Sequence, residues 1–522
     1  MSDLTKELSF EKDCQKKLVE GITKLSKAVK STLGAAGRTV LIESIHHTHG
    51  LVSTKDGVTV SKSISLLDPV ENLGVSVVKE AAERTATSSG DGTTTSIVLA
   101  EALILAGIEH IDESVNKTQV LREMGNAVNE VIENISKDKI DCTPEIMYKV
   151  AKTSSNNDDF VANLITEAYQ GVGVNGIVTV EKSQGNDTHF EVINGMLINR
   201  GYANPEFINN IESEECVFND VKILVCEAEI SSYLQLETIF PFIAQSQSKL
   251  LIIAPCTAEF VTVMASNKHK IGVCVIPPPN FGYKVHEQMS DIALVTGATH
   301  FSATTQDLST IQPQHLGYAK KVIVGKKRTV IIQGNGDKST IEQTANALKA
   351  SLTERKLKHE IDYINERIAS LVGGVGVIHV GGNTDLEQKE LFDRCEDAVG
   401  AVRSALEQGV IAGSGKPLFE VELLESKTKE REIANKIVLK AIKEPLTQIL
   451  RNADLTVDEV YNNHVLKQGK GFGYDLKNDQ YGDLIEMGVI DPLKVTKNAL
   501  LNALSVATTI LSTNTTIVIA RA

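Results

Sequence analysis

Glycine-rich and acidic stretches gather near both ends of this chain and are scarce in its middle. They occur between residues 34 and 95 and again between residues 397 and 491 of the 522 residues. The middle instead carries strand-like apolar runs with helical stretches between several of them, which is typical of an α/β domain. Either the chain holds two separate sites, or it leaves one domain, builds another and returns to the first.

The stretch GDGTTTS (residues 90–96) joins two helical patterns. Its glycines allow a turn and a close approach of the backbone to a ligand, and Asp91 offers the oxygen ligands that Mg²⁺ prefers. Thr93, Thr94 and Thr95 add hydroxyl groups where the N–H groups of a helix N-terminus attract phosphate. Helix capping by Asp or Thr is the alternative. We favour phosphate binding, because one cap would suffice and three consecutive threonines are poor helix formers. The following apolar segment predicts a buried helix.

Two further stretches have a similar character but weaker signals. STLGAAGR (31–38) ends a helix in a glycine turn, which alone favours a C-cap. TKDG (54–57) alone favours a β-turn. The sequence has no G-x-x-x-x-G-K-[ST], which disfavours a P-loop NTPase, and GGVGV (373–377) lacks the full dinucleotide-binding spacing.

Composition and charge exclude several classes of protein. The absence of a run of eighteen apolar residues predicts no transmembrane helix, and the charged N-terminal segment favours the cytoplasm by default. A net charge of −14 argues against nucleic-acid binding. Seven scattered cysteines without C-x-x-C suit a reducing compartment and give neither a zinc site nor a disulfide framework.

Periodicity and composition predict the elements along the chain. Helices are expected over 11–33, 70–137, 339–371, 387–408 and 430–510. Strands are expected over 39–44, 57–65, 176–183, 222–231, 249–255 and 271–279, with a β-hairpin over 320–334.

Seven stretches together resemble one family. They are TLGAAGR, TKDGVTV, GDGTTTSIVLAEAL, NRGYANPEFI, ASLVGGVGVIHVGG, CEDAVGAVRSALEQGVIAGSG and YGDLIEMGVIDPLKV. Their order and approximate spacing are similar to those of a group I chaperonin of the GroEL type, over roughly residues 3–518.

The resemblance implies a multidomain α+β fold in which both chain ends build one domain. It implies a mainly helical equatorial ATPase domain, a small intermediate hinge domain and an α/β apical substrate-binding domain. The boundaries implied are 1–137 with 409–522 (equatorial), 138–193 with 375–408 (intermediate) and 194–374 (apical). Gly195 and Gly374 fall at the apical–intermediate crossings, where glycine suits a hinge, although either could be an ordinary turn glycine.

The resemblance also implies a nucleotide site with ATP, Mg²⁺ and K⁺. Asp91 corresponds to the Mg²⁺ ligand, Asp397 to the carboxylate that orients the attacking water, and Asp56 to a residue close to that water. By base rate alone, Asp397 would be a solvated carboxylate on a helix face. The implied nucleotide-contacting residues are Thr32, Leu33, Gly34, Lys55, Gly57, Gly92, Thr93, Thr94, Thr95, Gly413, Ser414 and Asp491, the last of these at the ribose. The stretch 475–477 corresponds to the adenine edge.

The family captures unfolded client proteins on exposed apolar side chains of the apical domain. The implied client-binding residues are Tyr202, Phe207, Leu236, Ile239, Phe240, Phe260, Val263 and Met264. Their ordinary alternative is a helix face buried in a core. The resemblance further implies a homo-oligomer of one or two heptameric rings and a GroES-type co-chaperonin, with no nucleic-acid or membrane partner.

The sequence departs from the family at several positions. Ala35 and Ala36 replace a Pro-Lys pair, which puts nucleotide affinity in doubt, and Ser414 replaces a glycine. Glu206 replaces an aromatic residue in the apical loop, and the chain ends without the family's Gly-Met-rich tail. HHTHG (46–50) is expected at a hairpin tip that contacts a neighbouring subunit, and metal binding is its alternative.

The function expected from the resemblance is an ATP-driven protein-folding chamber whose cycle is timed by hydrolysis. A chaperonin-fold scaffold with little productive cycling is the alternative that the departures at Ala35, Ala36 and Ser414 suggest. A metabolic kinase that uses the Asp-Thr loop is a third hypothesis.

Overall fold

The architecture comes from a computed structural model. The residues that it describes are 6–43, 51–155, 157–172, 176–183, 185–211, 213–268, 270–279, 282–302, 308–351, 360, 363–364, 367–368, 370–371, 373–426, 428–466, 468–469 and 471–519.

The chain divides into two compact units. Unit 1 contains Met1–Thr166 and Asp393–Ala522, and unit 2 contains Glu167–Phe392. The two divisions fall inside helices α7 (Asp159–Val172) and α13 (Asp385–Gln408). The chain therefore leaves unit 1, builds unit 2 and returns to unit 1. This is the second of the two arrangements considered from the sequence. The three domain boundaries implied by the resemblance stay a prediction.

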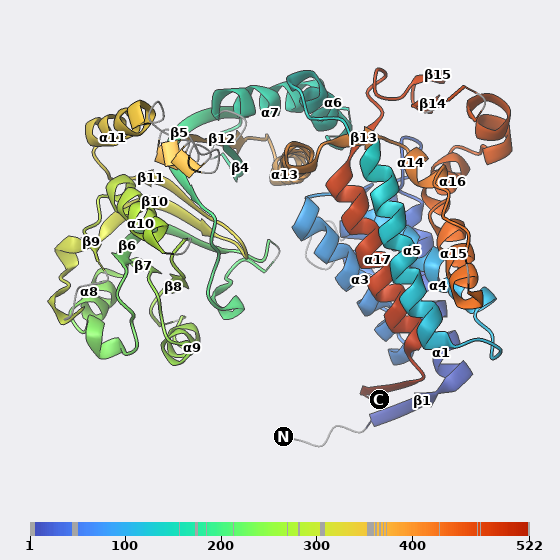
Figure 1. Ribbon diagram of the computed structural model, residues 1–522, viewed down its shortest axis with the longest axis horizontal. Helices are drawn as coiled ribbons and strands as arrows, with labels where there is room; N and C mark the ends of the chain where they lie inside the picture. Colours follow the sequence, from blue (N-terminus) through green and yellow to red (C-terminus); the bar gives the residue numbers. More distant parts are fainter. Residues whose placement is uncertain are drawn as a thin grey trace. The chain divides into compact units, whose positions relative to one another are not determined.

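Unit 1 is mainly helical in its described part. Its helices are α1 (Glu11–Lys30), α2 (Gly57–Ser63), α3 (Pro69–Ser89), α4 (Thr93–His110), α5 (Lys117–Lys137), α6 (Pro144–Ser154), α14 (Lys416–Phe419), α15 (Lys429–Ala441), α16 (Glu444–Asn452), the π-helix η6 (Asp458–Val465) and α17 (Leu493–Ser512). Helix α4 packs against α1, α3, α15 and α17, and Figure 1 shows the long helices of this unit running side by side.

The core of unit 1 explains the apolar character of α4. Ile97, Leu99, Leu103 and Ile104 are fully buried, although they do not share one face of the helix. A helix that is apolar nearly all round must be surrounded by other elements. The predicted burial of this helix is therefore confirmed.

The strands of unit 1 form two-stranded sheets. They are β1 (Lys6–Phe10) with β17 (Thr515–Ile519), β2 (Val40–Glu43) with β3 (Leu51–Thr54), β13 (Val410–Ala412) with β16 (Ile490–Pro492), and β14 (Phe472–Asp475) with β15 (Gln480–Asp483). The β1–β17 pair joins the two ends of the chain, which Figure 1 marks N and C. The HHTHG stretch between β2 and β3 lies outside the described residues.

The described residues of unit 2 are built around a nine-stranded mixed sheet. Its strands are β4 (Ile177–Lys182), β5 (His189–Ile198), β6 (Cys216–Cys226), β7 (Lys249–Ile253), β8 (Val273–Ile276), β9 (His300–Phe301), β10 (Gly317–Val324), β11 (Thr329–Gly334) and β12 (Gly374–Val380). The order is β4-β12-β5-β11-β10-β6-β7-β8, and β9 pairs with β6. The pairs among β6, β7, β8 and β9 are parallel.

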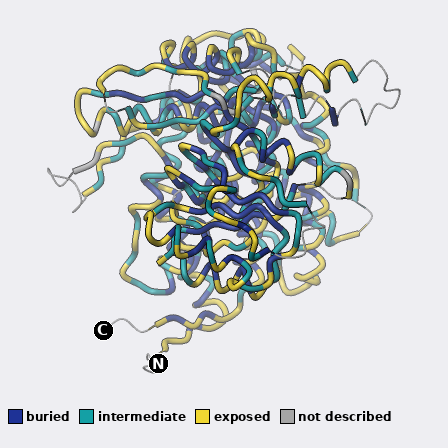
Figure 2. Tube along the Cα trace, turned by 90° about the vertical axis from the view of Figure 1, so that its left-hand side faces the viewer, coloured by how far each residue is buried: buried dark blue, intermediate teal, exposed yellow. Residues whose placement is uncertain are grey.

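Helices and short 3-10 segments accompany this sheet. They are η1 (Pro205–Phe207), η2 (Tyr233–Leu236), α8 (Ile239–Ser246), α9 (Ala258–Ser266), α10 (Tyr283–Thr296), η3 (Leu308–Thr310), η4 (Pro313–His315) and α11 (Lys338–Ser351). Strands β7 and β8 and the second half of β6 are almost continuously buried, as expected of parallel strands covered on both faces. Figure 2 draws such buried stretches in dark blue.

Most predicted elements are found, but two predictions are wrong. The hairpin over 320–334 is confirmed as the antiparallel pair β10–β11. The segment 57–65, predicted as a strand, instead forms α2. Its β-branched residues favour a strand, but the Asp56 side chain accepts hydrogen bonds from two amides and caps a helix there. The helical pattern over 430–510 is interrupted by the short strands β14, β15 and β16.

The two glycines predicted at a hinge lie in paired strands of unit 2. Gly195 is in β5 and Gly374 is in β12, where it is paired with Asn194. A Cβ atom at Gly195 would come within 2.3 Å of Val375 Cγ2. Close packing therefore accounts for glycine at position 195, and the hinge role stays a prediction.

In the part of the chain that the structure describes, none of the helices combines the length and the apolar character that a membrane crossing requires.

Candidate functional site

The loop before α4 leaves a helix N-terminus open. Gly90 and Gly92 adopt the left-handed conformation, and α4 begins at Thr93. Gly92 is the N-cap, and among the described residues no side chain caps this helix. The capping alternative therefore does not explain Asp91 or the three threonines. The first-turn N–H groups, with the positive end of the helix dipole, form a site that suits an anion.

The turn at residues 54–57 packs directly against this loop. A Cβ atom on Gly57 would come within 2.0 Å of the Thr94 hydroxyl oxygen, so any other residue there would displace the Thr94 side chain. The Asp56 carboxylate accepts hydrogen bonds from the amides of Val58 and Thr59 at 3.0 and 2.7 Å. Asp56 is therefore an N-cap of α2, held in place beside the threonine loop.

Helix α13 approaches the same loop through a contact between two glycines. A Cβ atom on Gly400 would come within 2.6 Å of Gly90 Cα, and one on Gly90 within 2.4 Å of Gly400 Cα. One turn further along, the Ser404 hydroxyl donates to the Ser89 carbonyl at 2.7 Å. Asp397 lies about one turn before Gly400 on α13. This contact holds the Asp397 segment of α13 beside Asp91.

Four carboxylates from four segments lie near one another here, because the charge of Asp91 interacts with those of Asp56, Asp397 and Asp491; these four residues are named below the acidic cluster. Desolvation by the surrounding protein, followed by repulsion from Asp91 and Asp56, raises the pKa of Asp397 well above its usual range. Desolvation and the Asp56 charge raise the pKa of Asp91, although its contacts with the Gly92 amide and the Ser154 side chain act in the opposite direction. Desolvation and the Asp91 charge raise the pKa of Asp491 to about 7.

The acidic cluster remains in reach of water. Asp56, Asp91 and Asp397 keep part of their surface exposed and Asp491 is half-buried, although the protein atoms packed around Asp91, Asp397 and Asp491 desolvate their carboxyl groups. Such carboxylates repel one another, and a cation bound among them would relieve the repulsion. The donor set consists of hard oxygen atoms, which suits Mg²⁺.

The loop after α1 lies against α16. Asn452 donates its side-chain amide to the Lys30 and Leu33 carbonyls, both at 2.8 Å. Thr32 donates its hydroxyl to the Val29 carbonyl, and Gly34 has a left-handed backbone. Asn452 therefore fixes the turn that contains Thr32, Leu33 and Gly34, a role that no motif in the sequence indicated.

Residues 413–415 connect β13 to α14. Gly413 donates its amide to the Val489 carbonyl at 2.8 Å, next to β16, which contains Asp491. Ser414 has a φ of 60°, in the left-handed region that disfavours residues other than glycine. The serine that departs from the family pattern is therefore accommodated with backbone strain.

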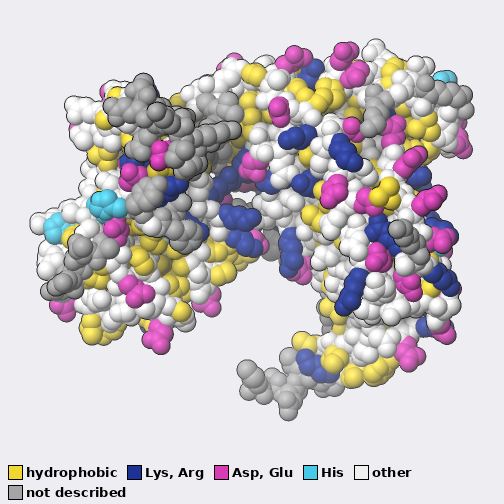
Figure 3. Space-filling model, in the orientation of Figure 1, with side chains coloured by type: hydrophobic (Ala, Val, Ile, Leu, Met, Phe, Trp, Pro, Cys, Tyr) yellow, Lys and Arg dark blue, Asp and Glu magenta, His cyan; other side chains and the backbone are white. Residues whose placement is uncertain are grey.

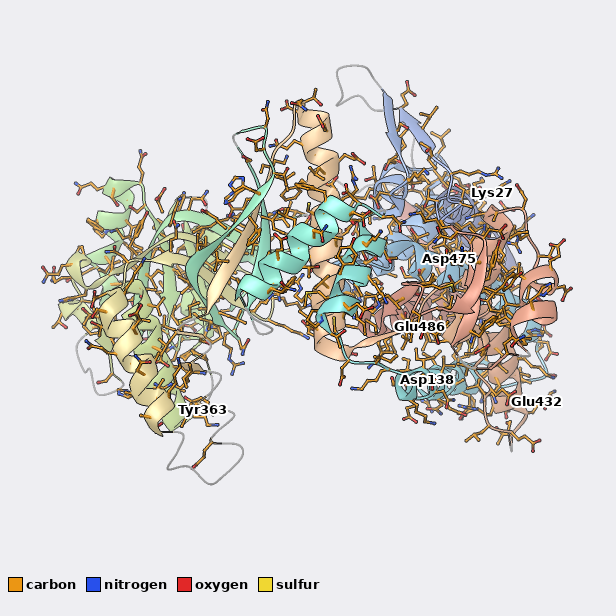
Figure 4. The ribbon with its side chains drawn as sticks, turned by 90° about the horizontal axis from the view of Figure 1, so that it is seen from above. Lys27, Asp138, Tyr363, Glu432, Asp475 and Glu486 are labelled. Carbon is orange, nitrogen blue, oxygen red and sulfur yellow. The ribbon has the colours of Figure 1, made fainter. Side chains whose placement is uncertain are left out.

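Asp475, labelled in Figure 4, has a local structural role. Its carboxylate accepts hydrogen bonds from the Lys477 and Asn478 amides and from the Asn478 side chain, which closes the turn between β14 and β15. Its predicted place at an adenine edge stays a prediction.

The residues expected to bind clients are mostly not on the surface of unit 2. Only Val263 is exposed, and Tyr202 is half-buried. The buried ones are Phe207, Leu236, Ile239, Phe240, Phe260 and Met264, all in the main apolar core of the unit. For these six the expected exposure is wrong, because their side chains fill the space between the sheet and its helices. The alternative of a buried face is the one observed.

Other apolar side chains of unit 2 are exposed. Tyr233 and Leu234, in η2, each keep 57 % of their surface exposed, and Val263 on α9 keeps 47 %. Ile211 is also exposed. Periodicity did not reveal Tyr233 and Leu234, because η2 is too short to have an amphipathic repeat.

Comparison with known families adds evidence that covers nearly the whole chain. The sequence model of the TCP-1/cpn60 chaperonin family matches residues 25–276 and 243–521 of this chain. The chain belongs to this chaperonin family. The sequence-based recognition of a divergent chaperonin of the GroEL type is thereby confirmed.

Solved chaperonin structures have the same fold. One is the chaperonin gp146 from the bacteriophage EL 2 (Pseudomonas aeruginosa), crystallised in the presence of ATP-BeFx, in its crystal form II. It matches with a TM-score of 0.70 and 24 % identity, over 100 % of both chains. Its crystal form I matches with a TM-score of 0.64 and the same identity, over 99 % of both chains. The predicted multidomain α+β chaperonin fold is therefore confirmed.

Proposed function

We propose that this chaperonin hydrolyses ATP, assembles into rings and encloses unfolded client proteins to promote their folding. The observation that carries the proposal is the acidic cluster at the uncapped N-terminus of α4. An anion site and a group of carboxylates side by side suit a phosphate chain with its divalent cation. The phage chaperonin of similar fold was crystallised with an ATP analogue, which supports nucleotide binding here.

Each part of the site has a distinct proposed role. The backbone N–H groups of Thr93, Thr94 and Thr95 bind phosphate oxygens, and Gly92 allows the backbone to approach them. Asp91 is the proposed Mg²⁺ ligand, and bound Mg²⁺ would offset the charge of the phosphate oxygens. Asp491 is the proposed acceptor for the ribose. Lys55 and Gly57 lie in the turn proposed to face the terminal phosphate.

Asp397 and Asp56 are the proposed catalytic carboxylates. In phosphoryl transfer the protein contributes mainly positioning and charge stabilisation. Asp397 is proposed to accept a hydrogen bond from the attacking water and orient it, with Asp56 close to that water. Its raised pKa gives Asp397 more basicity than an ordinary aspartate, which suits this role. We also propose K⁺ as a second cation and a cytoplasmic location.

Ring assembly is supported by the surface of the β1–β17 pair. Leu8 is paired with Ile517, and Phe10 and Ile519 lie on the same face. All four side chains are exposed, whereas the residues that lie between them along each strand are buried. Figure 3 shows hydrophobic side chains on this ribbon. An exposed apolar face of this kind is typical of a surface that another subunit covers, so we propose that this ribbon contacts a neighbouring subunit. A heptameric ring and a GroES-type lid are the expected forms.

Client capture is proposed on Tyr233, Leu234 and Val263. Exposed apolar side chains bind unfolded chains without sequence preference. Of the client-binding residues implied by the family resemblance, Val263 is retained because it is exposed. The six buried residues are not retained.

A scaffold that cycles ATP poorly is the second candidate. The serine at position 414 favours it, because Ser414 stands where the family has a glycine and its side chain restricts how closely the backbone can approach a nucleotide. The absence of a Pro-Lys pair at Ala35 and Ala36 acts in the same direction.

The two candidates are separated by activity and imaging together. ATP hydrolysis is measured with Mg²⁺, with and without K⁺, and particles are imaged with and without ATP. Refolding of a denatured client is followed with and without a lid protein. The proposal expects rings, K⁺-stimulated hydrolysis and ATP-dependent refolding. Rings without turnover would favour the scaffold, and a monomer under every nucleotide condition would contradict both.

A further inference from the structure

A group of two histidines and one glutamate lies in unit 2, and none of its members has been assigned a role above. Glu227 follows β6, His300 is in β9 and His286 is in α10. His286 Nδ1 lies 2.9 Å and His300 Nε2 lies 2.8 Å from the same oxygen, Glu227 Oε1. The two imidazole rings are tilted, with centroids 4.9 Å apart.

The backbone holds two of these side chains in register. Strand β9 runs parallel to β6, with His300 beside Val225. The Glu227 amide continues this pairing by donating to the Phe301 carbonyl at 2.8 Å. Glu227 and His300 therefore occupy neighbouring positions on two paired segments. Helix α10 places His286 beside them. Residues far apart in sequence are thus held together by regular structure.

Burial differs across the group in a way that suits a metal centre. The Glu227 and His300 side chains are only 9 % and 14 % exposed, whereas His286 is 62 % exposed. Two ligands are thus fixed in the protein, and the third lies at the surface, where an ion and its water molecules have access. Figure 3 shows histidine side chains on the surface of this unit.

We propose that Glu227, His286 and His300 bind one zinc-like divalent ion, with water completing the coordination. One candidate ligand atom from each residue lies within 4.8 Å of the other two. Zinc bonds of about 2.0–2.2 Å place two tetrahedral ligands about 3.3–3.6 Å apart. The observed N···O distances are shorter by a few tenths of an ångström, which small side-chain rotations can supply. Imidazole nitrogen with one carboxylate favours Zn²⁺ over Mg²⁺ or Ca²⁺.

Such an ion would connect α10 to the β6–β9 strand pair. This site contains no cysteine, which is why the cysteine pattern of the sequence gave no sign of it. It shares no residue with the acidic cluster, so the proposal is independent of ATP hydrolysis.

The test measures Zn²⁺ affinity of the full chain after chelator treatment. The parent carries His46→Ala, His47→Ala and His49→Ala, because the HHTHG stretch could bind zinc itself. Excess Mg²⁺ is present to compete at the acidic cluster. The affinity is read from competition with a chromophoric chelator, and Co²⁺ substitution reports the coordination number through its visible absorption.

The parent is expected to bind one Zn²⁺ per chain, with a Co²⁺ spectrum of four-coordinate type. His286→Ala removes an exposed ligand and should weaken binding at least about 100-fold, since the loss of an outer-shell partner alone costs 10–100-fold. Glu227→Gln should do the same. His464→Ala, at an exposed histidine of unit 1, is the matched control and should bind as the parent does.

Two results would overturn the proposal. One is a parent that binds no Zn²⁺ in this competition. The other is a His286→Ala protein, folded by circular dichroism, whose zinc affinity equals that of the parent. In either case the three side chains form only a hydrogen-bonded group.

Discussion

Asp491 illustrates how the acidic cluster affects stability at the level of one residue. The pKa of its carboxyl group is raised from the usual value near 4 to about 7. Between these values the folded state binds more protons than the unfolded state, so the free energy of unfolding falls as pH rises. Above about pH 7 the charged Asp491 carboxylate lowers the free energy of unfolding by its full amount. Below about pH 4 it does not lower it at all.

Asp491→Asn should therefore stabilise the nucleotide-free chain in a pH-dependent way. The variant removes the charge but keeps the shape. We expect a gain of about 1–2 kcal/mol at pH 8, reduced because water partly reaches the group, and almost none at pH 4. Urea unfolding at several pH values, followed by circular dichroism, measures this gain. A gain that is equal at both pH values would contradict the assigned cause.

The contact between Gly90 and Gly400 makes a second prediction. Gly400→Ala adds a Cβ that must displace the loop or α13, since it would lie 2.6 Å from Gly90 Cα. Asp397 should then be misplaced, and ATP turnover should fall about 10–100-fold with little change in ATP affinity. Steady-state hydrolysis and nucleotide binding by calorimetry measure the two effects.

Gly125→Ala provides the matched control for this substitution. Gly125 is also in a helix, α5, and a Cβ atom there would have nothing within 4 Å. We expect about 0.5–1 kcal/mol of added stability and unchanged turnover. Equal effects of the two alanines on turnover would show that the glycine contact does not position Asp397.

Among the elements, the β1–β17 ribbon should control assembly. Ile517→Glu places a charge on its exposed apolar face without touching the core. The charged ribbon should lose its covering subunit, so the assembled fraction should fall, while the circular dichroism spectrum stays unchanged. Light scattering coupled to size exclusion measures the mass. Leu424→Glu, at another exposed leucine of unit 1, is the control, and an unaltered ring in the Ile517 variant would exclude the ribbon from the interface.

The short element η2 and helix α9 should control client capture. The double variant Leu234→Ser, Val263→Ser removes two exposed apolar side chains and should weaken binding of an unfolded client several-fold at unchanged ATPase activity. Leu236→Ser is an informative contrast, because Leu236 is buried and its loss should instead lower the thermal midpoint. Client binding followed by fluorescence anisotropy measures the capture step. Unchanged binding in the double variant would remove these residues from the client surface.

Across the whole molecule, the motifs predicted the family and the approach of distant segments better than they predicted local structure. Asp56, Asp91, Asp397 and Asp491 were singled out from sequence, and all four meet in unit 1. The family resemblance led to the choice of these four residues. Local sequence patterns do not indicate that residue 91 lies near residue 397. Segment 57–65 was mistaken for a strand because the capping by Asp56 and the Gly57–Thr94 contact outweigh β propensity.

The remaining errors have physical causes as well. Burial of Phe207 and Leu236 depends on how the sheet and helices of unit 2 close over them, which a short apolar run does not specify. Asn452 acts through a hydrogen bond to a loop about 420 residues earlier, which gives no local signal. Gly400 had a signal that could have been used, since a glycine inside a helical pattern often marks close packing.

We propose that carboxylates from distant segments converge on Mg²⁺-bound ATP at the N-terminus of α4. The most direct test compares ATP binding and single-turnover hydrolysis for Asp397→Asn and the unmodified chain. For Asp397→Asn we expect an ATP dissociation constant within about 3-fold of that of the unmodified chain and a hydrolysis rate lower by at least about 100-fold. An Asp397→Asn variant that hydrolyses ATP as fast as the unmodified chain would contradict the proposed role of Asp397.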